Sequence, residues 1–314
     1  MARSRALLAL GITVASGGCA PVARPPERVR ADSPAALERK RQAARALPLE
    51  STLRLGCNEW PPYVLGPGSD FQGFAVDLTR EALKRMGWRL EFRNRPWARC
   101  LQEMLRGELD GVLCAYRAPG RDWPFGEVPL GLGPDWSGEF LILRRKGSAW
   151  RCQGPADLRS ARLALVEGYA YPEPLASRLK AGDPGILLVT GDDPMTRLVE
   201  VVARGRAEGT VEQRLPLEAV LKRRPDLRDK VEEAGVLPGW RVYVALRPDF
   251  PNAEAVLREL DRRLLEVYRS PRFRAILAPY GLEPSGGAGG APTGSGRPTR
   301  PGGQRAREWN AQSG

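Results

Sequence analysis

The chain has 314 residues, of which 42% are hydrophobic and 27% charged, enough for two globular domains of ordinary size. It contains no histidine, which excludes histidine general bases, Ser-His and Cys-His nucleophile pairs and His-ligated metal sites. The formal net charge of +12 is concentrated at the two ends, because residues 51–283 hold 36 Lys and Arg against 32 Asp and Glu. Basic ends without a nucleic-acid-binding motif are typical of solvated segments, so we expect no nucleic-acid partner.

The first 19 residues are predicted to be an export signal. Arg3 and Arg5 precede a ten-residue apolar run, Ala6–Ala15, which is too short to span a bilayer as a stable helix. The following Ser16-Gly17-Gly18-Cys19 resembles a bacterial lipoprotein cleavage box, in which Cys19 becomes the lipidated first residue. Plain signal-peptidase cleavage is the alternative, because Ser16 stands where the box usually has leucine. We expect a periplasmic or cell-surface protein that is held at the membrane by a lipid on Cys19.

Two segments have compositions that disfavour a packed core. Residues 20–50 are rich in Pro, Arg and Ala, as expected of a tether, with room for a short helix over Ala35–Arg45. Residues 284–314 are rich in Gly, Pro and Ser and are predicted to be disordered. The folded part is therefore expected between residues 51 and 283.

This folded part begins with alternating strands and helices. The strand Leu53–Cys57 is followed by a helix over Phe74–Met86 and a strand over Arg89–Phe92. The next helix places Leu101, Met104 and Leu105 on one face and ends at Gly107, before an apolar strand over 109–115. Right-handed crossovers predict one parallel sheet from these three strands.

A second alternating series follows the predicted strand Glu139–Arg145. Its strands are expected at Arg162–Val166, Ile186–Val189, Gly209–Glu212 and Trp240–Leu246, and its helices at Tyr171–Leu179, Pro194–Ala203, Asn252–Tyr268 and Pro271–Ala278.

Several motifs occur in an order that points to a family. They are Trp60-Pro61-Pro62-Tyr63, Gly73 to Leu78, Gly107 to Asp110, Arg121 and the GYAYPEPL segment at 168–175. Together they resemble the bacterial extracellular solute-binding proteins of the polar amino acid type, family 3, which deliver substrates to ABC importers. The resemblance implies an α/β fold of the type II periplasmic-binding-protein kind, with two lobes that close on the ligand and a mostly parallel, helix-flanked sheet in each.

The same resemblance sets the expected organisation and partners. Lobe one would comprise residues 51–137 plus 243–283, and lobe two residues 138–242. The expected partners are a small ligand and an ABC permease in the inner membrane. We expect a monomer without catalytic activity, cofactor or metal.

The resemblance also suggests where a ligand binds. Trp60 and Trp97 match the two aromatic positions that sandwich the ligand side chain, although core packing is the alternative for both. Arg121 matches the arginine that binds the ligand carboxylate through two parallel hydrogen bonds, and Arg117 is a second candidate for that role. Asp77 and Asp110 are interpreted as capping and packing residues.

In lobe two, Gly168 and Tyr169 precede the helix expected at Tyr171. Free backbone amides at that helix start are expected to hold the same carboxylate from the other side. Gln213 stands where relatives present an acidic residue to the ligand's amino group, and Glu212 is adjacent. An ammonium beside a neutral amide lacks its counter-charge.

Cys114 and Ala115 stand where amino-acid binders present serine or threonine. Together with Gln213, these residues disfavour a standard α-amino acid as the ligand. Two other functions remain open. One is a dehydratase-like enzyme on the same scaffold, with Glu59 or Glu212 as a proton donor of raised pKa. The other is a sensory or scaffold lipoprotein with a degenerate pocket.

Besides Cys19, the chain has Cys57, Cys100, Cys114 and Cys152. In an exported protein these residues can form disulfides, but the sequence does not determine the pairing, and their spacing predicts no metal site.

Overall fold

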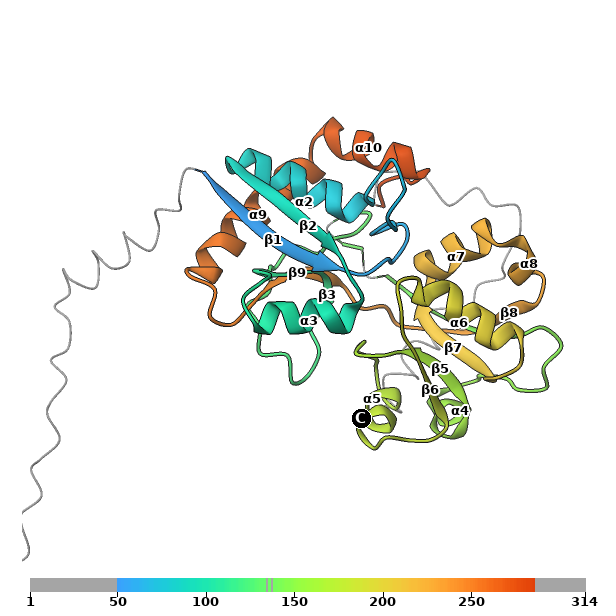
Figure 1. Ribbon diagram of the computed structural model, residues 1–314. Helices are drawn as coiled ribbons and strands as arrows, with labels where there is room; N and C mark the ends of the chain where they lie inside the picture. The colour runs from blue at the N-terminus through green and yellow to red at the C-terminus, as the bar shows by residue number, and fades with distance from the viewer. Residues whose placement is uncertain (1–49, 134, 137, 286–314) are drawn as a thin grey trace, which may run out of the picture. The chain divides into compact units, whose positions relative to one another are not determined.

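The computed structural model describes residues 50–133, 135–136 and 138–285 (Figure 1). The predicted export signal, Cys19, the helix at Ala35–Arg45 and most of the C-terminal segment lie outside the described residues. The chain forms two sheets that are both flanked by helices, in agreement with the predicted α/β class. No helix of the described part is long and apolar enough to cross a membrane.

The first sheet has the strand order β2-β1-β3-β9. Its strands are β1 (Ser51–Cys57), β2 (Trp88–Asn94), β3 (Gly111–Tyr116) and β9 (Val242–Leu246). β1 pairs in parallel with both β2 and β3, so the predicted three-stranded parallel sheet is confirmed. β9 adds to β3 in the antiparallel direction. The two backbones come so close that a Cβ at Gly111 would lie 2.1 Å from the carbonyl oxygen of Ala245, which explains the glycine.

The strand order also determines where the helices lie. The connection from β1 to β2 carries α2 (Phe74–Arg85), and the connection from β2 to β3 carries α3 (Trp97–Leu105). These connections run in opposite directions across the sheet, and right-handed crossovers then place the two helices on opposite faces (Figure 1). α9 (Ala253–Tyr268) and α10 (Pro271–Leu277) pack against α2, and a 3-10 turn at Ala278–Tyr280 follows. Every residue of β3 is buried, as expected of a strand covered on both faces.

The second sheet has the order β6-β5-β7-β4-β8. β5 pairs in parallel with β6 and β7, and β4 is antiparallel to both β7 and β8. Its strands are β4 (Phe140–Arg145), β5 (Leu163–Val166), β6 (Ile186–Val189), β7 (Gly209–Gln213) and β8 (Val231–Leu237), and the helices of this part are α4 (Pro155–Ser160), α5 (Leu175–Lys180), α6 (Pro194–Ala203), α7 (Arg214–Arg223) and α8 (Pro225–Arg228).

Two sequence predictions about helices were wrong in detail. The helix expected from Tyr171 begins at Leu175, because Tyr171 and Glu173 both precede prolines and residues in that position are disfavoured in α conformation. In α3, Met104 is buried as predicted, but the exposed fraction of Leu105 is 76%. The buried face of α3 is instead formed by Trp97, Cys100, Glu103 and Met104.

The segment predicted to be disordered begins at residue 284. Ser285, the last described residue, donates from its backbone nitrogen to the carbonyl oxygen of Leu132 at 2.6 Å. Its hydroxyl donates to the same oxygen at 3.0 Å. Ser285 is therefore held against the loop at Leu132, and the rest of the segment lies outside the described residues.

The central position of β3 can be tested by shortening one leucine. Leu113 is fully buried in β3, so Leu113→Ala is expected to lower the free energy of unfolding by about 2–5 kcal/mol. The matched change Leu105→Ala removes an exposed side chain and is expected to alter it by less than about 0.5 kcal/mol. Denaturant unfolding followed by circular dichroism measures both. Equal effects would contradict the burial of β3.

Candidate functional site

A pocket lies at the carboxyl ends of β1 and β3. The described residues belong to one compact unit, and residues associated with both sheets line this pocket. The space within it that is free of atoms, including its open mouth, is about 300 Å³. The carboxyl ends of parallel strands are the usual ligand-binding edge of an α/β sheet. The lining residues are Cys57, Asn58, Trp60, Trp97, Cys114, Tyr116, Arg121, Tyr169 and Ala170.

Arg121 is the only charged residue among those that line the pocket. Its Nη2 donates to the carbonyl oxygen of Gly168 at 3.0 Å, and its Nη1 donates to that of Tyr116 at 3.4 Å. The guanidinium carbon lies 5.7 Å from the ring centre of Trp97 and 5.2 Å from that of Trp123. No carboxylate of the described residues forms an ion pair with Arg121. Burial lowers the pKa of Arg121, but a guanidinium stays charged in proteins. Arg121 is therefore a cation without an anionic partner among the described residues.

The structure places Arg117, the other candidate, outside the pocket. Its Nη2 lies 2.8 Å from Oε1 of Glu127 and donates to the carbonyl oxygen of Gly126 at 2.6 Å. Its guanidinium also lies over the ring of Tyr243, at 4.6 Å. Arg117 is therefore already neutralised and stacked.

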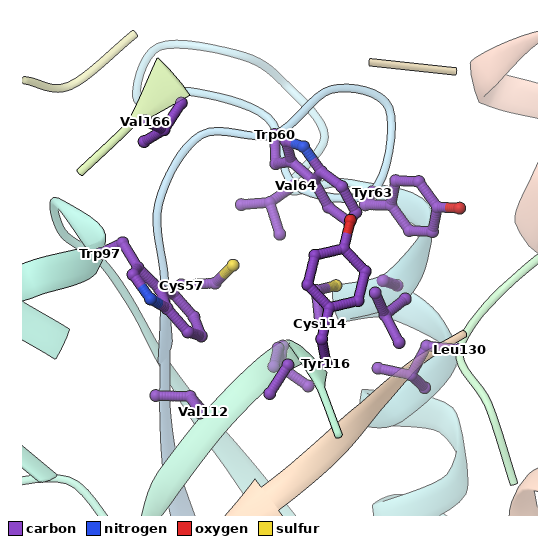
Figure 2. Close-up of a cluster of buried hydrophobic side chains, with 14 of the residues drawn as sticks. Cys57, Trp60, Tyr63, Val64, Trp97, Val112, Cys114, Tyr116, Leu130 and Val166 are labelled. Carbon is purple, nitrogen blue, oxygen red and sulfur yellow. The ribbon is translucent and has the colours of Figure 1, made fainter. Parts of the chain in front are cut away.

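Trp60 and Trp97 are both pocket-lining and buried, with exposed fractions of 3% and 6%. One face of Trp60 is stacked on Tyr63 at 4.5 Å between ring centres. The indole nitrogen of Trp97 donates to the carbonyl oxygen of Gly168 at 3.0 Å. The two interpretations made from the sequence, ligand contact and core packing, are thus compatible, because each side chain packs in the core and also borders the pocket (Figure 2).

The loop after β5 lines the pocket with Tyr169 and Ala170, whereas Gly168 does not line it and contacts two lining side chains, Arg121 and Trp97. No helix starts at this loop, so the predicted helix-start amides are not present in that form. Gly168 presents its carbonyl oxygen to Arg121 and Trp97, and the Tyr169 amide donates to Val166 at 3.3 Å. The amides of Gly168 and Ala170 make no hydrogen bond with the described residues, so they remain able to donate.

Glu212 is fully buried in β7 and is not among the lining residues. Its Oε1 accepts from the Gln213 amide at 2.7 Å. Its Oε2 has no hydrogen-bond partner in the described part of the chain, and the same holds for the Trp60 Nε1 and the Tyr116 hydroxyl. Burial raises the pKa of the Glu212 carboxyl to about 8, against the opposing effect of the Gln213 amide. Unpartnered buried polar atoms are uncommon and are concentrated here beside the pocket.

Gln213 takes part in a hydrogen-bonded chain that links segments of the two sheets. Its Oε1 accepts from the Tyr63 hydroxyl at 3.1 Å, and its Nε2 donates to the carbonyl oxygen of Trp240 at 2.8 Å. The Tyr63 hydroxyl in turn accepts from the Trp136 indole at 2.8 Å. Both ends of the Gln213 amide are therefore occupied by the protein itself.

Two thiols, those of Cys57 and Cys114, also line the pocket (Figure 2). Cys114 has a φ of 57°, in the left-handed region, where the pairing of β3 with β9 shifts register between Val112 and Ala115. Interaction with Cys114 and burial raise the pKa of the Cys57 thiol well above its usual value. Ala115 is fully buried and does not line the pocket. The four described cysteines are free, and no cluster of metal-ligating side chains occurs among the described residues.

Sequence reasoning missed four lining residues, Cys57, Asn58, Tyr116 and Ala170. The Asn58 Nδ2 lies 2.7 Å from the Tyr169 hydroxyl, a second contact across the pocket. Asn58 is two residues before Trp60, and Tyr116 ends a strand that leads to Arg121. Both residues lie close in sequence to residues predicted for the site, and this proximity could have identified them.

The two-sheet α/β architecture, with a pocket at strand ends lined from both sides, defines the type II periplasmic-binding-protein fold. Residues 53–122 match the family of bacterial extracellular solute-binding proteins, family 3, and the resemblance predicted from the sequence is thereby confirmed. No curated protein sequence matches the chain.

Solved structures share the fold at low sequence identity. An ancestral arginine-binding protein bound to arginine has a TM-score of 0.59 and 20% identity, covering 74% of this chain and 99% of its own. A histidine kinase sensor domain similar to periplasmic binding proteins has a TM-score of 0.58 and 21% identity, covering 75% and 96%. A Salmonella typhimurium periplasmic binding protein with high arginine specificity has a TM-score of 0.55 and 21% identity, covering 73% and 98%. The predicted fold class is thereby confirmed.

The raised pKa of Glu212 predicts a pH dependence of stability. Between the ordinary pKa of 4.5 and about 8, the folded protein keeps a proton that the unfolded chain has lost, so stability falls as pH rises. Over this window the free energy of unfolding of the wild type is expected to fall with pH more steeply than that of Glu212→Gln, whose amide stays neutral. The difference between the two slopes is up to about 1.4 kcal/mol per pH unit. Denaturant unfolding from pH 5 to 8 measures the slopes.

The control for this experiment is Glu254→Gln, since the exposed fraction of the Glu254 side chain is 86%. It should keep the pH slope of the wild type. Parallel slopes for the wild type and Glu212→Gln would show that Glu212 is ionised in the folded protein.

Proposed function

We propose that this chain is an extracytoplasmic solute-binding protein that captures a small polar solute bearing a carboxylate. The solute is an amino acid or a related compound, and the protein delivers it to an ABC permease after its two lobes close on it. Export with a lipid anchor at Cys19 and a monomeric state belong to the same proposal. The observation that carries it is the pocket-lining Arg121, whose guanidinium has no anionic partner among the described residues.

An arginine in this setting selects for a planar anion. Its five N–H groups match the two oxygens of a carboxylate, and only two hydrogen bonds to the described residues use them. Charge-assisted bonds of this kind are roughly twice as strong as bonds between neutral groups. The free amides of Gly168 and Ala170 provide donors from the opposite side. A carboxylate between these groups would neutralise the guanidinium and satisfy the amides.

The contacts across the pocket explain how capture and closure are coupled. Arg121 and Trp97, near the first sheet, both donate to Gly168 near the second. Glu59 and Arg223 form an ion pair at 3.1 Å across the same divide. A ligand that binds Arg121 and the Gly168 loop together adds to these contacts only when the lobes are closed, so it shifts the population towards the closed state.

Similar structures support a small carboxylate-bearing solute. Two of those described above bind arginine, and another similar structure belongs to glutathione import in Streptococcus mutans. The kinase sensor domain shows that the fold also serves sensing, so the fold alone does not separate transport from sensing. The family match favours transport.

A specific observation bears on the enzyme alternative. The pKa values of Glu59 and Glu212 are both raised by burial, as a proton donor would require. Neither carboxyl lines the pocket, and Glu59 is paired with Arg223. A group that cannot reach the ligand cannot transfer a proton to it, so the binding function is favoured.

The proposal predicts a stabilising ligand. The purified chain is expected to melt at a higher temperature with one member of a panel of amino acids, dipeptides and organic acids. A ligand at about 100 times its dissociation constant adds roughly 2.7 kcal/mol, which corresponds to a shift of roughly 5–10 °C. Differential scanning fluorimetry measures the shift. No shift across a carboxylate panel would contradict the proposal, and turnover of the bound compound would favour an enzyme.

The role of Arg121 can be separated from that of a neighbouring arginine. Arg121→Ala is expected to weaken binding of the carboxylate ligand by roughly 30-fold or more, because a charge pair formed by a half-buried guanidinium loses one partner. The matched control is Arg117→Ala, which removes a residue already paired with Glu127 and is expected to change affinity by less than about threefold. Isothermal titration calorimetry measures both constants. Full affinity in Arg121→Ala would remove this residue from the site.

A further inference from the structure

Four of the nine residues that line the pocket are aromatic. Trp60 lies edge to face with Tyr116, with 6.2 Å between ring centres and an interplanar angle of 90°. Trp97 lies in the same way against Tyr169, at 6.1 Å and 81°. Two perpendicular pairs of rings therefore border one space, and Figure 2 shows three of these side chains around it. We call these four residues the aromatic cage.

The remaining lining offers few hydrogen-bond acceptors. The amide of Asn58 and the hydroxyl of Tyr169 bind each other, and the carbonyl of Gly168 already accepts from Trp97 and Arg121. The thiols of Cys57 and Cys114 are weak acceptors. The lining contains no carboxylate.

A primary ammonium group would be poorly accommodated in such a pocket. It carries three N–H donors and a full charge, and both lose their hydration on binding. At the position where relatives present an acidic side chain, Gln213 is neutral, binds Tyr63 and Trp240, and does not line the pocket. Glu212 lies beside it but does not border the pocket. Among the lining side chains the Tyr116 hydroxyl is left as an unpartnered acceptor, but the carboxylate that usually pairs with an α-amino group is missing.

A fully methylated ammonium group has the opposite requirements. It has no N–H to satisfy, and its charge is spread over methyl groups that are attracted to the faces of aromatic rings. We propose that the ligand is a quaternary ammonium carboxylate, a betaine, with its methylated nitrogen in the aromatic cage and its carboxylate on Arg121. This inference rests on the proposed function, in which Arg121 binds a carboxylate, and adds the chemistry of the other end of the ligand.

The test compares ligands that differ only in methylation. Calorimetric titration of the full chain with glycine, N-methylglycine, N,N-dimethylglycine and N,N,N-trimethylglycine is expected to show affinity rising along the series. The trimethylated compound should bind at least about 100-fold more tightly than glycine. Proline and N,N-dimethylproline test the same difference on a larger frame, and 3,3-dimethylbutyrate has the shape of trimethylglycine without its positive charge. 3,3-Dimethylbutyrate should bind at least about tenfold more weakly than trimethylglycine.

Cage variants connect the result to the named rings. Tyr169→Leu is expected to weaken trimethylglycine binding about tenfold and to leave 3,3-dimethylbutyrate binding within about twofold, because only the cation loses a ring face. Tyr169→Phe keeps the ring, loses the hydroxyl contact with Asn58, and should retain the wild-type preference for the methylated compound.

Several outcomes would overturn the inference. If arginine, glutamine or unmethylated glycine binds more tightly than the methylated compounds and depends on Arg121, the betaine assignment fails while the proposed function stands. Equal binding of trimethylglycine and 3,3-dimethylbutyrate would show that the pocket responds to shape and not to charge. Failure of every carboxylate, methylated or not, would overturn the proposed function and this inference together.

Discussion

The parallel pairing of β1 with β2 and β3 is the constraint on which the site depends. Parallel strands end at one edge of the sheet, and their crossover helices cover its two faces. The loop after β1 supplies Asn58 and Trp60, the start of α3 supplies Trp97, and the end of β3 leads to Tyr116 and Arg121. Residues that are more than 60 positions apart in the chain therefore meet at one pocket. The antiparallel β9 holds this arrangement from the outer side of β3.

At the centre of the pocket, electrostatics and packing act in opposite directions. Partial burial of Arg121 beside Trp97 and Trp123 removes some water from a charge that has no anionic partner in the described residues, which makes an anion favourable at that point. Burial of Glu212 suppresses a charge instead. It raises the pKa of the carboxyl to about 8, so the side chain keeps its proton and is uncharged at neutral pH. The pocket therefore presents net positive charge to a ligand, although an acidic side chain lies close behind Trp60.

Much of this was predictable, and the failures have physical causes. The parallel sheet, the stripe of α2 and the bounds of α6 follow from hydrophobic periodicity and glycine or proline stops, which act locally. Arg121 and Arg117 are alike in sequence, and only the tertiary position of Glu127 distinguishes them. The helix after Gly168 was placed too early because an apolar period was followed across two prolines. The half-exposed pattern of β8 gave no strand signal, because that strand is stabilised by pairing with β4.

The chain of hydrogen bonds from Trp136 through Tyr63 and Gln213 to Trp240 has a thermodynamic consequence. Gln213, which by the resemblance stands where relatives present an acidic residue, contributes in this chain to the protein's own conformational equilibrium. These hydrogen bonds form whether or not a ligand is bound. In the protein without a ligand they therefore raise the population of the conformation in which Tyr63 and Gln213 are in contact. Under the proposed function, a smaller share of the ligand's binding free energy is then needed to bring the two parts together.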